Sequence, residues 1–299
     1  MWQHLSAVSK GLLCLAFASF LFATAGVFIR LASQYASTEH VVFIRNIVGL
    51  LMFTPFILKK GVAHFKTRQP LLHLLRSITG ISAMYAFFYG IAHFSLSEAM
   101  MFVYAAPVFV PVLGHFLLKE RVNAHAYLIA FVGISGVFLA LQPDQGGDKV
   151  AFHAMLLIGL FCTLMSALAF ICIRKLSHTE PAERTVFYFT LIGSVLTFFL
   201  VYDKRFSFSL LEWSLLIAVG LITTLAQVFL TRGYSYAFAG KIAPASYLTV
   251  VFAGFYGWLF WNEMPDSVSV CGYILVFVAA VLVVKANTPE KKTGESFND

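Results

Sequence analysis

Two arginines lie inside long apolar stretches of this sequence. Arg45 falls in FIRNIVGLL (residues 43–51) and Arg76 in LLRSITGISAM (residues 74–84). Near the centre of a bilayer, a charge costs roughly 2.5 to 3.5 kcal/mol unless it is paired, hydrated or able to reach the interface. Arg45 therefore either extends to the membrane surface or is held inside by a carboxylate. That carboxylate could come from Glu98 or from a bound small molecule.

Uncharged polar and aromatic side chains form a second group of candidates for ligand binding. They lie in or at the ends of apolar stretches and comprise Asn46, Ser82, Tyr85, Tyr104, Gln227, Tyr247 and Trp258. Each could contact a polar ligand. Each could equally hydrogen-bond two helices together or anchor a helix at the membrane interface. Tyr104 and Tyr247 are the stronger candidates because they occupy matching positions in two similar segments.

Two prolines interrupt one of the most apolar stretches. In MFVYAAPVFVPVLGHFLL (residues 101–118), Pro107 and Pro111 stand four residues apart. Proline removes a backbone donor and clashes with the preceding turn, but a membrane helix tolerates it when its neighbours satisfy the freed carbonyls. The pair predicts a bent helix. The bend is either a fixed packing feature or part of the wall or gate of a cavity.

The sequence carries no recognisable enzyme motif. It has no HExxH, Walker or GxSxG pattern, and its cysteines show no CxxC spacing. All the aspartates fall in connections or in the tail, at Asp144, Asp148, Asp203, Asp266 and Asp299. The net charge of +7 is spread over short connections, which disfavours nucleic acid as a partner. We therefore expect no enzymatic activity, no metal site and no cofactor.

Composition places the chain in a membrane. Of its 299 residues 60% are hydrophobic and 12% are charged, whereas soluble domains are about 45–50% apolar and about 25% charged. A spanning helix needs about 20 mostly apolar residues. We predict an all-α protein with ten spans, at 11–31, 40–58, 71–92, 97–118, 124–141, 153–173, 185–202, 210–231, 241–262 and 267–285.

The connections between these spans differ in charge. With the N-terminus in the cytoplasm, 15 Lys and Arg residues fall on the cytoplasmic side. Only four fall on the other side, at Arg30, Lys149, Lys204 and Arg205. Because cytoplasmic connections are enriched in Lys and Arg, we expect both termini in the cytoplasm.

The chain repeats itself after about 144 residues. A shift of 144 aligns Arg30 with Arg174, and a shift of 143 aligns Glu120 with Glu263. The repeat unit holds five spans, so the second copy enters the membrane from the opposite side. The sequence thus predicts two inverted five-helix repeats, 1–143 and 144–285, followed by a polar cytoplasmic tail, 286–299. Glu120 and Glu263 end their helices and are expected to form structural ion pairs.

These features resemble the EamA-type branch of the drug/metabolite transporter superfamily. The residues that match its pattern are Pro107, Gly114, Glu120, Gly133 and Gly136, and Arg45 falls at the usual arginine of the second helix. The stretch 74–99 is similar to the third helix of members related to S-adenosylmethionine and riboflavin carriers. The ninth span departs from the pattern, because it has Val250 and Gly254 where the fourth has its prolines.

The resemblance implies a secondary transporter of the bacterial inner membrane that works by alternating access. Its substrates would be small polar or amphipathic metabolites, such as amino-acid-like, nucleoside-like or vitamin-like molecules, bound between the two halves. The energy would come from the substrate gradient, from protons or from a counter-substrate, in a monomer or homodimer. A channel-like facilitator or a membrane scaffold remains the alternative.

Overall fold

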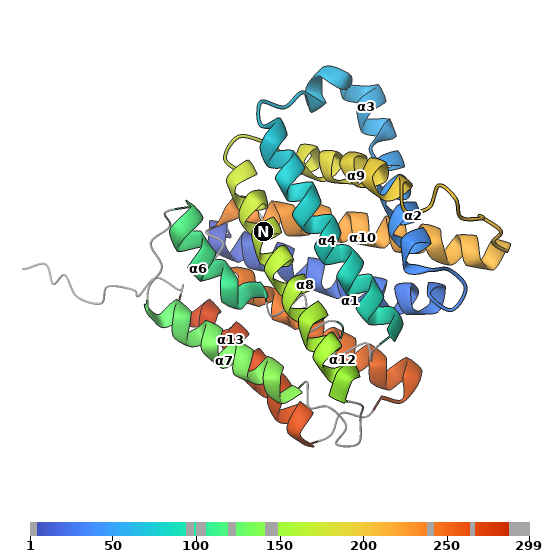
Figure 1. The fold of residues 1–299 in the computed structure, drawn as a ribbon. Helices are drawn as coiled ribbons and strands as arrows, with labels where there is room; N and C mark the ends of the chain where they lie inside the picture. The colour runs from blue at the N-terminus through green and yellow to red at the C-terminus, as the bar shows by residue number, and fades with distance from the viewer. Residues whose placement is uncertain are drawn as a thin grey trace, which may run out of the picture.

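The structure, a computed structural model, describes residues 5–93, 99, 106–118, 124–140, 149–237, 242–263 and 267–286. These residues form helices and no strands (Figure 1). The first part of the chain holds α1 (Ala7–Ala32), α2 (Thr38–Leu51), α3 (Thr54–Lys60), η2 (Val62–Phe65), α4 (Pro70–His93), α6 (Ala106–Leu118) and α7 (Ala124–Ala140). The second part holds α8 (Lys149–Leu176), α9 (Ala182–Phe198), α10 (Leu210–Tyr236), η3 (Ala243–Tyr247), α12 (Leu248–Trp261) and α13 (Ser267–Ala286).

Local sequence signals set several helix ends. Ser6 caps α1 by accepting a hydrogen bond from the backbone N–H of Ser9. At the start of α10, Ser209 and Glu212 form a reciprocal capping box. Asn262 ends α12 in the left-handed conformation, with φ of 53°, which a short polar side chain tolerates. These caps satisfy backbone groups that the helix itself leaves unpaired.

Five helical stretches of the described residues are long and apolar enough to cross a membrane, by length and composition. They are α1, the stretch Thr38–Lys59, α4, the part of α8 from Leu157 to Leu176, and α10. The chain is thus a multi-pass membrane protein. Large side chains such as Phe116, Phe131 and Phe199 are exposed on its outer faces, as contact with lipid requires. Helices also occupy the other predicted segments where these are described, but ten spans and the inverted repeat stay predictions.

Two predicted spans are interrupted. The segment predicted as one helix over 40–58 breaks between Leu51 and Thr54, because Pro55 has no N–H to continue the ladder from α2 into α3. The segment predicted over 241–262 begins as a tight 3-10 turn around Pro244 before α12 starts at Leu248. Both breaks follow from prolines visible in the sequence.

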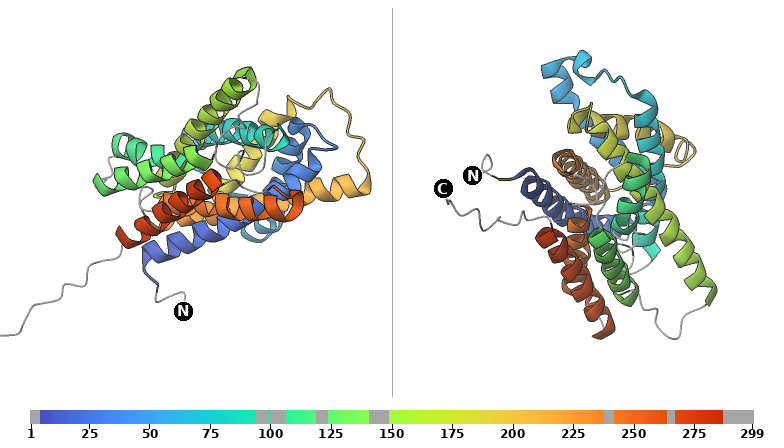
Figure 2. Two further views of the ribbon diagram at one scale, coloured as in Figure 1. Left: turned by 90° about the horizontal axis from the view of Figure 1, so that it is seen from below. Right: turned by 90° about the vertical axis from the view of Figure 1, so that its left-hand side faces the viewer.

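Helices from the two parts of the chain pack on each other. α1 lies along α10, α4 lies along α8, and α7 lies beside α13 (Figures 1 and 2). α2 contacts both α9 and α10, while α4 also contacts α9. This interleaving brings side chains from distant parts of the sequence together at the centre of the bundle.

Candidate functional site

A partly open cavity lies between α1, α4, α8 and α10, and about 70 Å³ of it is accessible to the centres of water-sized molecules. Arg45 of α2 adds to its wall. The polar part of the lining comes from Arg45, Arg76, Ser166, Thr223 and Gln227. The cavity therefore combines groups from five helices, which is typical of ligand sites between helices of a bundle.

Arg45 faces the protein interior. Only 1% of its surface is exposed. Its Nε donates to Thr223 Oγ1 of α10 at 3.1 Å, and its Nη1 donates to Asn46 Oδ1 at 2.8 Å. Asn46 is itself fixed, because its Nδ2 donates to the Val42 carbonyl at 3.0 Å. The side chain is thus held by fixed acceptors and does not extend to the membrane surface.

Arg76 is buried with fewer partners. It is 3% exposed, and its Nη2 donates to Gln227 Oε1 at 3.0 Å. Its Nε and Nη1 are buried and have no hydrogen-bond partner within the described parts of the chain. An unsatisfied buried donor is rare in native proteins, and it is especially costly on a charged group.

Phe189 of α9 connects the two arginines. The guanidinium carbon of Arg76 lies 4.1 Å from the Phe189 ring centroid and that of Arg45 lies 5.0 Å from it. Since both distances end at one point, the two carbons are at most 9.1 Å apart. The ring attracts each cation through its negative face but does not neutralise either charge.

No carboxylate compensates these two charges among the residues described. Four of the described glutamates form ion pairs elsewhere, as Glu39–Lys204, Glu180–Arg184, Glu183–Arg232 and Glu263–Arg30. Glu212 belongs to the helix cap at Ser209, and the one described aspartate, Asp203, is exposed in the connection before α10. The predicted partner Glu98 lies outside the described residues. The described cavity wall therefore carries an excess of positive charge.

The remaining wall of the cavity is apolar. Its aromatic members are Phe22 of α1, Phe87 and Phe88 of α4, and Phe170 of α8. Met84 and several aliphatic residues complete the surface. Such a wall suits the apolar body of a ligand, while the arginines suit a polar end.

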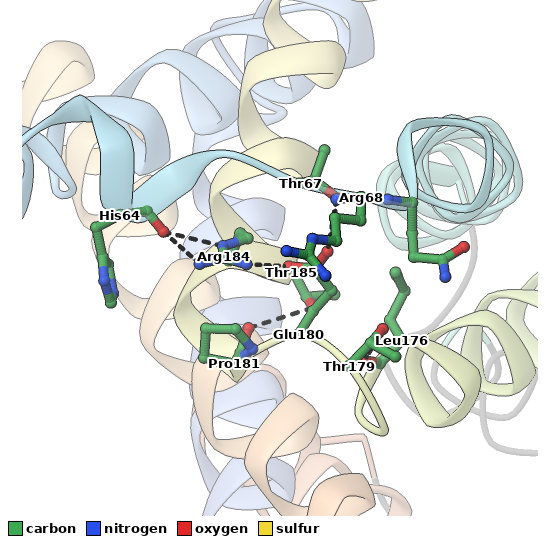
Figure 3. Close-up of polar contacts among 10 residues, drawn as sticks. His64, Thr67, Arg68, Leu176, Thr179, Glu180, Pro181, Arg184 and Thr185 are labelled. Atoms are coloured by element: carbon green, nitrogen blue, oxygen red, sulfur yellow. Dashed lines mark hydrogen bonds and ion pairs between the residues drawn. The ribbon is translucent and has the colours of Figure 1, made fainter.

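Polar contacts join the two parts of the chain at one end of the bundle (Figure 3). The side chain of Arg184 donates to the His64 carbonyl at 3.0 Å and to Glu180 Oε2 at 2.6 Å. Glu180 Oε1 accepts from Thr67 Oγ1 at 2.7 Å and from the Arg68 N–H at 3.3 Å. We call this group the Glu180 cluster. It ties the segment between η2 and α4 to the connection between α8 and α9.

Glu180 stays ionised in this cluster. Burial raises the pKa of its carboxyl, but hydrogen bonds from Thr67 and Arg184, the charge of Arg184 and the Arg68 N–H outweigh that effect. The net result is a pKa below the ordinary range of glutamate. The cluster is therefore formed throughout the neutral range.

A second group of contacts lies near the start of α2. Glu39 accepts from Tyr85 Oη at 2.8 Å and pairs with Lys204 Nζ at 3.0 Å. Arg30, near the end of α1, pairs with Glu263 and lies over the Trp261 ring at 4.4 Å. We call these residues the Glu39 cluster. The ion pair of Glu263 confirms its predicted structural role.

The structure brings together four of the predicted site residues and separates others. Arg45, Asn46, Arg76 and Gln227 meet at the cavity. Ser82 is half-buried and is not part of the described wall.

Three predicted aromatic residues, Tyr85, Tyr247 and Trp258, are not part of the described cavity wall. Tyr85 contacts Glu39 instead. Tyr247 is fully buried against Gly133, where its Oη would lie 2.6 Å from a β-carbon at that glycine. Trp258 is 45% exposed on the outer surface of α12.

The other candidates are described only in part. Tyr104 lies outside the described residues, as Glu98 does. The backbone of Pro107 and Pro111 is part of α6, and their gating role stays a prediction.

Sequence reasoning missed Phe189 and Gly80. Phe189 is one of 32 phenylalanines, and no local pattern distinguishes it. Gly80 lies so close to Arg76 that an added β-carbon would come within 2.0 Å of Nη1. Its position four residues after Arg76, one helical turn away, was the available signal.

Comparison with known proteins agrees with this architecture. The family described as the EamA-like transporter family matches residues 9–142 and 153–285. A pseudopaline exporter of Pseudomonas aeruginosa is 31% identical over 278 residues, covering 93% of this chain and 96% of the exporter. An S-adenosylmethionine uptake transporter of Rickettsia prowazekii is 24% identical over 268 residues, covering 88% and 89%. A solved crystal structure shares the fold, with a TM-score of 0.73 over 93% of this chain at 16% identity.

Proposed function

Because the chain belongs to the EamA-like transporter family, we propose that it is a secondary transporter that moves small polar or amphipathic metabolites by alternating access. The family and the similar proteins are transporters and not enzymes. The observation that carries the proposal is the central cavity, in which two buried arginines face an apolar wall. A membrane protein without a ligand for these charges has little reason to keep them buried.

The pattern of helix contacts supports two inverted halves, 1–143 and 144–285. In an inverted repeat, the helices of the second half correspond in chain order to those of the first. The pairs would be α1 with α8, α2 with α9, α4 with α10, α6 with α12 and α7 with α13, and the contacts between helices then come in matching pairs. The contact of α1 with α10 corresponds to that of α8 with α4, and the contact of α1 with α12 corresponds to that of α8 with α6. The pairs α2–α9 and α7–α13 join counterparts directly. Two halves related by an inverted repeat are expected to make such equivalent contacts with each other.

The two clusters of polar contacts supply closures at opposite ends of the bundle. Each cluster joins residues of one half to residues of the other, as in the pairs Thr67–Glu180 and Glu39–Lys204. Opening one cluster while keeping the other would expose the cavity to one side of the membrane. The excess of Lys and Arg in the predicted cytoplasmic connections supports an orientation with the Glu180 cluster and both termini on the cytoplasmic side of a bacterial inner membrane.

The similar proteins support metabolites of the amino-acid type as substrates. One is named for S-adenosylmethionine, a derivative of an amino acid. The substrate gradient, protons or a counter-substrate would provide the driving force.

Counterflow tests this proposal. The purified protein is reconstituted into liposomes loaded with unlabelled methionine, phenylalanine or 3-phenylpropionate, and uptake of the same radiolabelled compound is followed. A carrier predicts saturable uptake that the internal compound accelerates. Uptake that never saturates and is unaffected by the internal compound would instead support a channel-like facilitator.

A further inference from the structure

The hydrogen-bond donors of Arg76 indicate the chemistry of a ligand that would fit the cavity. A guanidinium carries five N–H groups in a planar fork. Arg76 uses one to bind Gln227, and its buried Nε and Nη1 have no acceptor within the described chain. Arg45 uses two, toward Thr223 and Asn46. The side chains nearby thus hold both arginines in place but leave Nε and Nη1 of Arg76 without an acceptor among the described residues.

Gly80 keeps the space around Arg76 open. A β-carbon at this position would lie 2.0 Å from Nη1 of Arg76 and 3.0 Å from the Phe189 ring. The guanidinium therefore takes its present position because residue 80 has no side chain, and a methyl group there would displace it. Gly80 and Arg76 both line the cavity, and the unpaired Nε and Nη1 of Arg76 are buried behind this wall, so a small shift of the guanidinium would present them to a ligand.

We propose that the transported substrate carries a carboxylate that binds Arg76, with Arg45 as the second cation, and an apolar body that packs on the phenylalanines. This inference rests on the proposed transport function and specifies its substrate class. A planar carboxylate matches the guanidinium fork, and an ionised acceptor forms shorter and stronger hydrogen bonds than a neutral one. Phe22, Phe87 and Phe170 line the rest of the same cavity.

The charge of the cavity also selects against cationic groups. None of the described lining residues is acidic, so an ammonium group would enter a wall that already carries two positive charges. A carboxylic acid of net negative charge therefore binds more tightly than the corresponding zwitterionic amino acid. A neutral amide of the same shape lacks the charge that the arginines require.

Thermal unfolding of the purified full-length protein tests this assignment with defined probes. We expect 3-phenylpropionate at ten times its Kd to raise the unfolding temperature by about 2–4 °C, because it binds only the folded state. We expect phenylalanine to act more weakly and 3-phenylpropionamide not to act at all. Benzylphosphonate is the probe for a phosphate-type site, and a carboxylate site predicts that it raises the unfolding temperature less than 3-phenylpropionate does.

Three variants connect the binding to Arg76. Arg76→Gln is expected to weaken 3-phenylpropionate binding about 10- to 100-fold, because hydrogen bonds to a charged group are lost. Arg76→Lys keeps the charge but not the fork and should restore little binding. Gly80→Ala keeps both arginines but displaces the guanidinium of Arg76, so it should also weaken binding. It provides the test if Arg76→Gln fails to fold. Arg205→Gln, in an exposed connection, is the matched control and should bind as the wild type does.

Several results would overturn the assignment. They are the absence of any shift with 3-phenylpropionate, an equal shift with its amide, a shift with benzylphosphonate alone, and equal binding by wild type and both Arg76→Gln and Gly80→Ala. Failure of the transport proposal looks different. Counterflow of 3-phenylpropionamide as fast as that of 3-phenylpropionate would reject the carboxylate assignment and keep the transport function. Binding of 3-phenylpropionate without counterflow would keep the assignment and reject the transport function.

Discussion

The Glu180 cluster should control opening of its end of the protein. Glu180→Gln removes the charge that accepts from Arg184 at 2.6 Å and from Thr67 at 2.7 Å, while keeping the size of the side chain. A hydrogen bond to a charged group is worth about 1.5–3 kcal/mol. Losing one such contribution shifts the equilibrium between closed and open states by about 10- to 150-fold toward the open state.

Distances between two spin labels can follow this opening. Lys66 and His178 are exposed and flank the cluster on its two sides, so each can be replaced by a labelled cysteine in a background without the four native cysteines. Glu180→Gln should add a population at longer distance. The control is Glu183→Gln, which breaks the ion pair of Glu183 with Arg232 within the second part of the chain and should leave the distance unchanged. An identical distance distribution in the wild type and in Glu180→Gln would refute the reasoning.

The same labels test the pH dependence of the cluster. The pKa of Glu180 is lowered in the folded protein. Its ionised carboxylate therefore stabilises the closed cluster fully above the ordinary carboxyl pKa of about 4.3, and this stabilisation is lost as the pH falls through the lowered pKa. The distances should thus stay the same between pH 7 and pH 5. A transition to the open state within that range would contradict the ionised state assigned to Glu180.

Three further predictions concern orientation and transport. Both Arg45→Lys and Arg45→Gln should impair transport at normal protein levels, because neither reproduces the donors to Thr223 and Asn46; wild-type rates in both would remove Arg45 from the site. On intact cells, an impermeant thiol reagent should label a single cysteine in the 142–150 connection and not one in 61–69, and the opposite result would invert the orientation. Pro107→Ala combined with Pro111→Ala should slow transport severalfold in protein that still inserts, whereas unchanged rates would reduce the prolines to packing features.

The sequence was sufficient to identify the buried arginines as unusual. Charges within apolar stretches are rare enough to stand out, and Arg45 and Arg76 both line the cavity. Gln227 was also predicted, and it contacts Arg76 from the second part of the chain. The break before Pro55 could have been predicted too, since proline lacks the donor that a continuous helix needs.

The faces of the most apolar helices could not be predicted. Nearly every residue of α12 is apolar, so the sequence does not distinguish the side that meets lipid from the side that meets protein. The sequence therefore does not reveal that Trp258 lies on the outer surface of α12, and its predicted part in ligand binding stays a prediction. The contact of Phe189 with both arginines depends on how α9 packs against α2 and α4, which is set by tertiary structure.

Alternating access of the cavity can be measured at Ser166, a buried residue of its wall. A cysteine at this position, without the native cysteines, is exposed to an impermeant thiol reagent in right-side-out and in inverted membrane vesicles. We predict reciprocal changes: Glu180→Gln should raise labelling from the cytoplasmic side and lower it from the outside, and Glu39→Gln should do the opposite. Labelling that rises from both sides together, or that neither substitution changes, would contradict a cavity that opens to one side at a time.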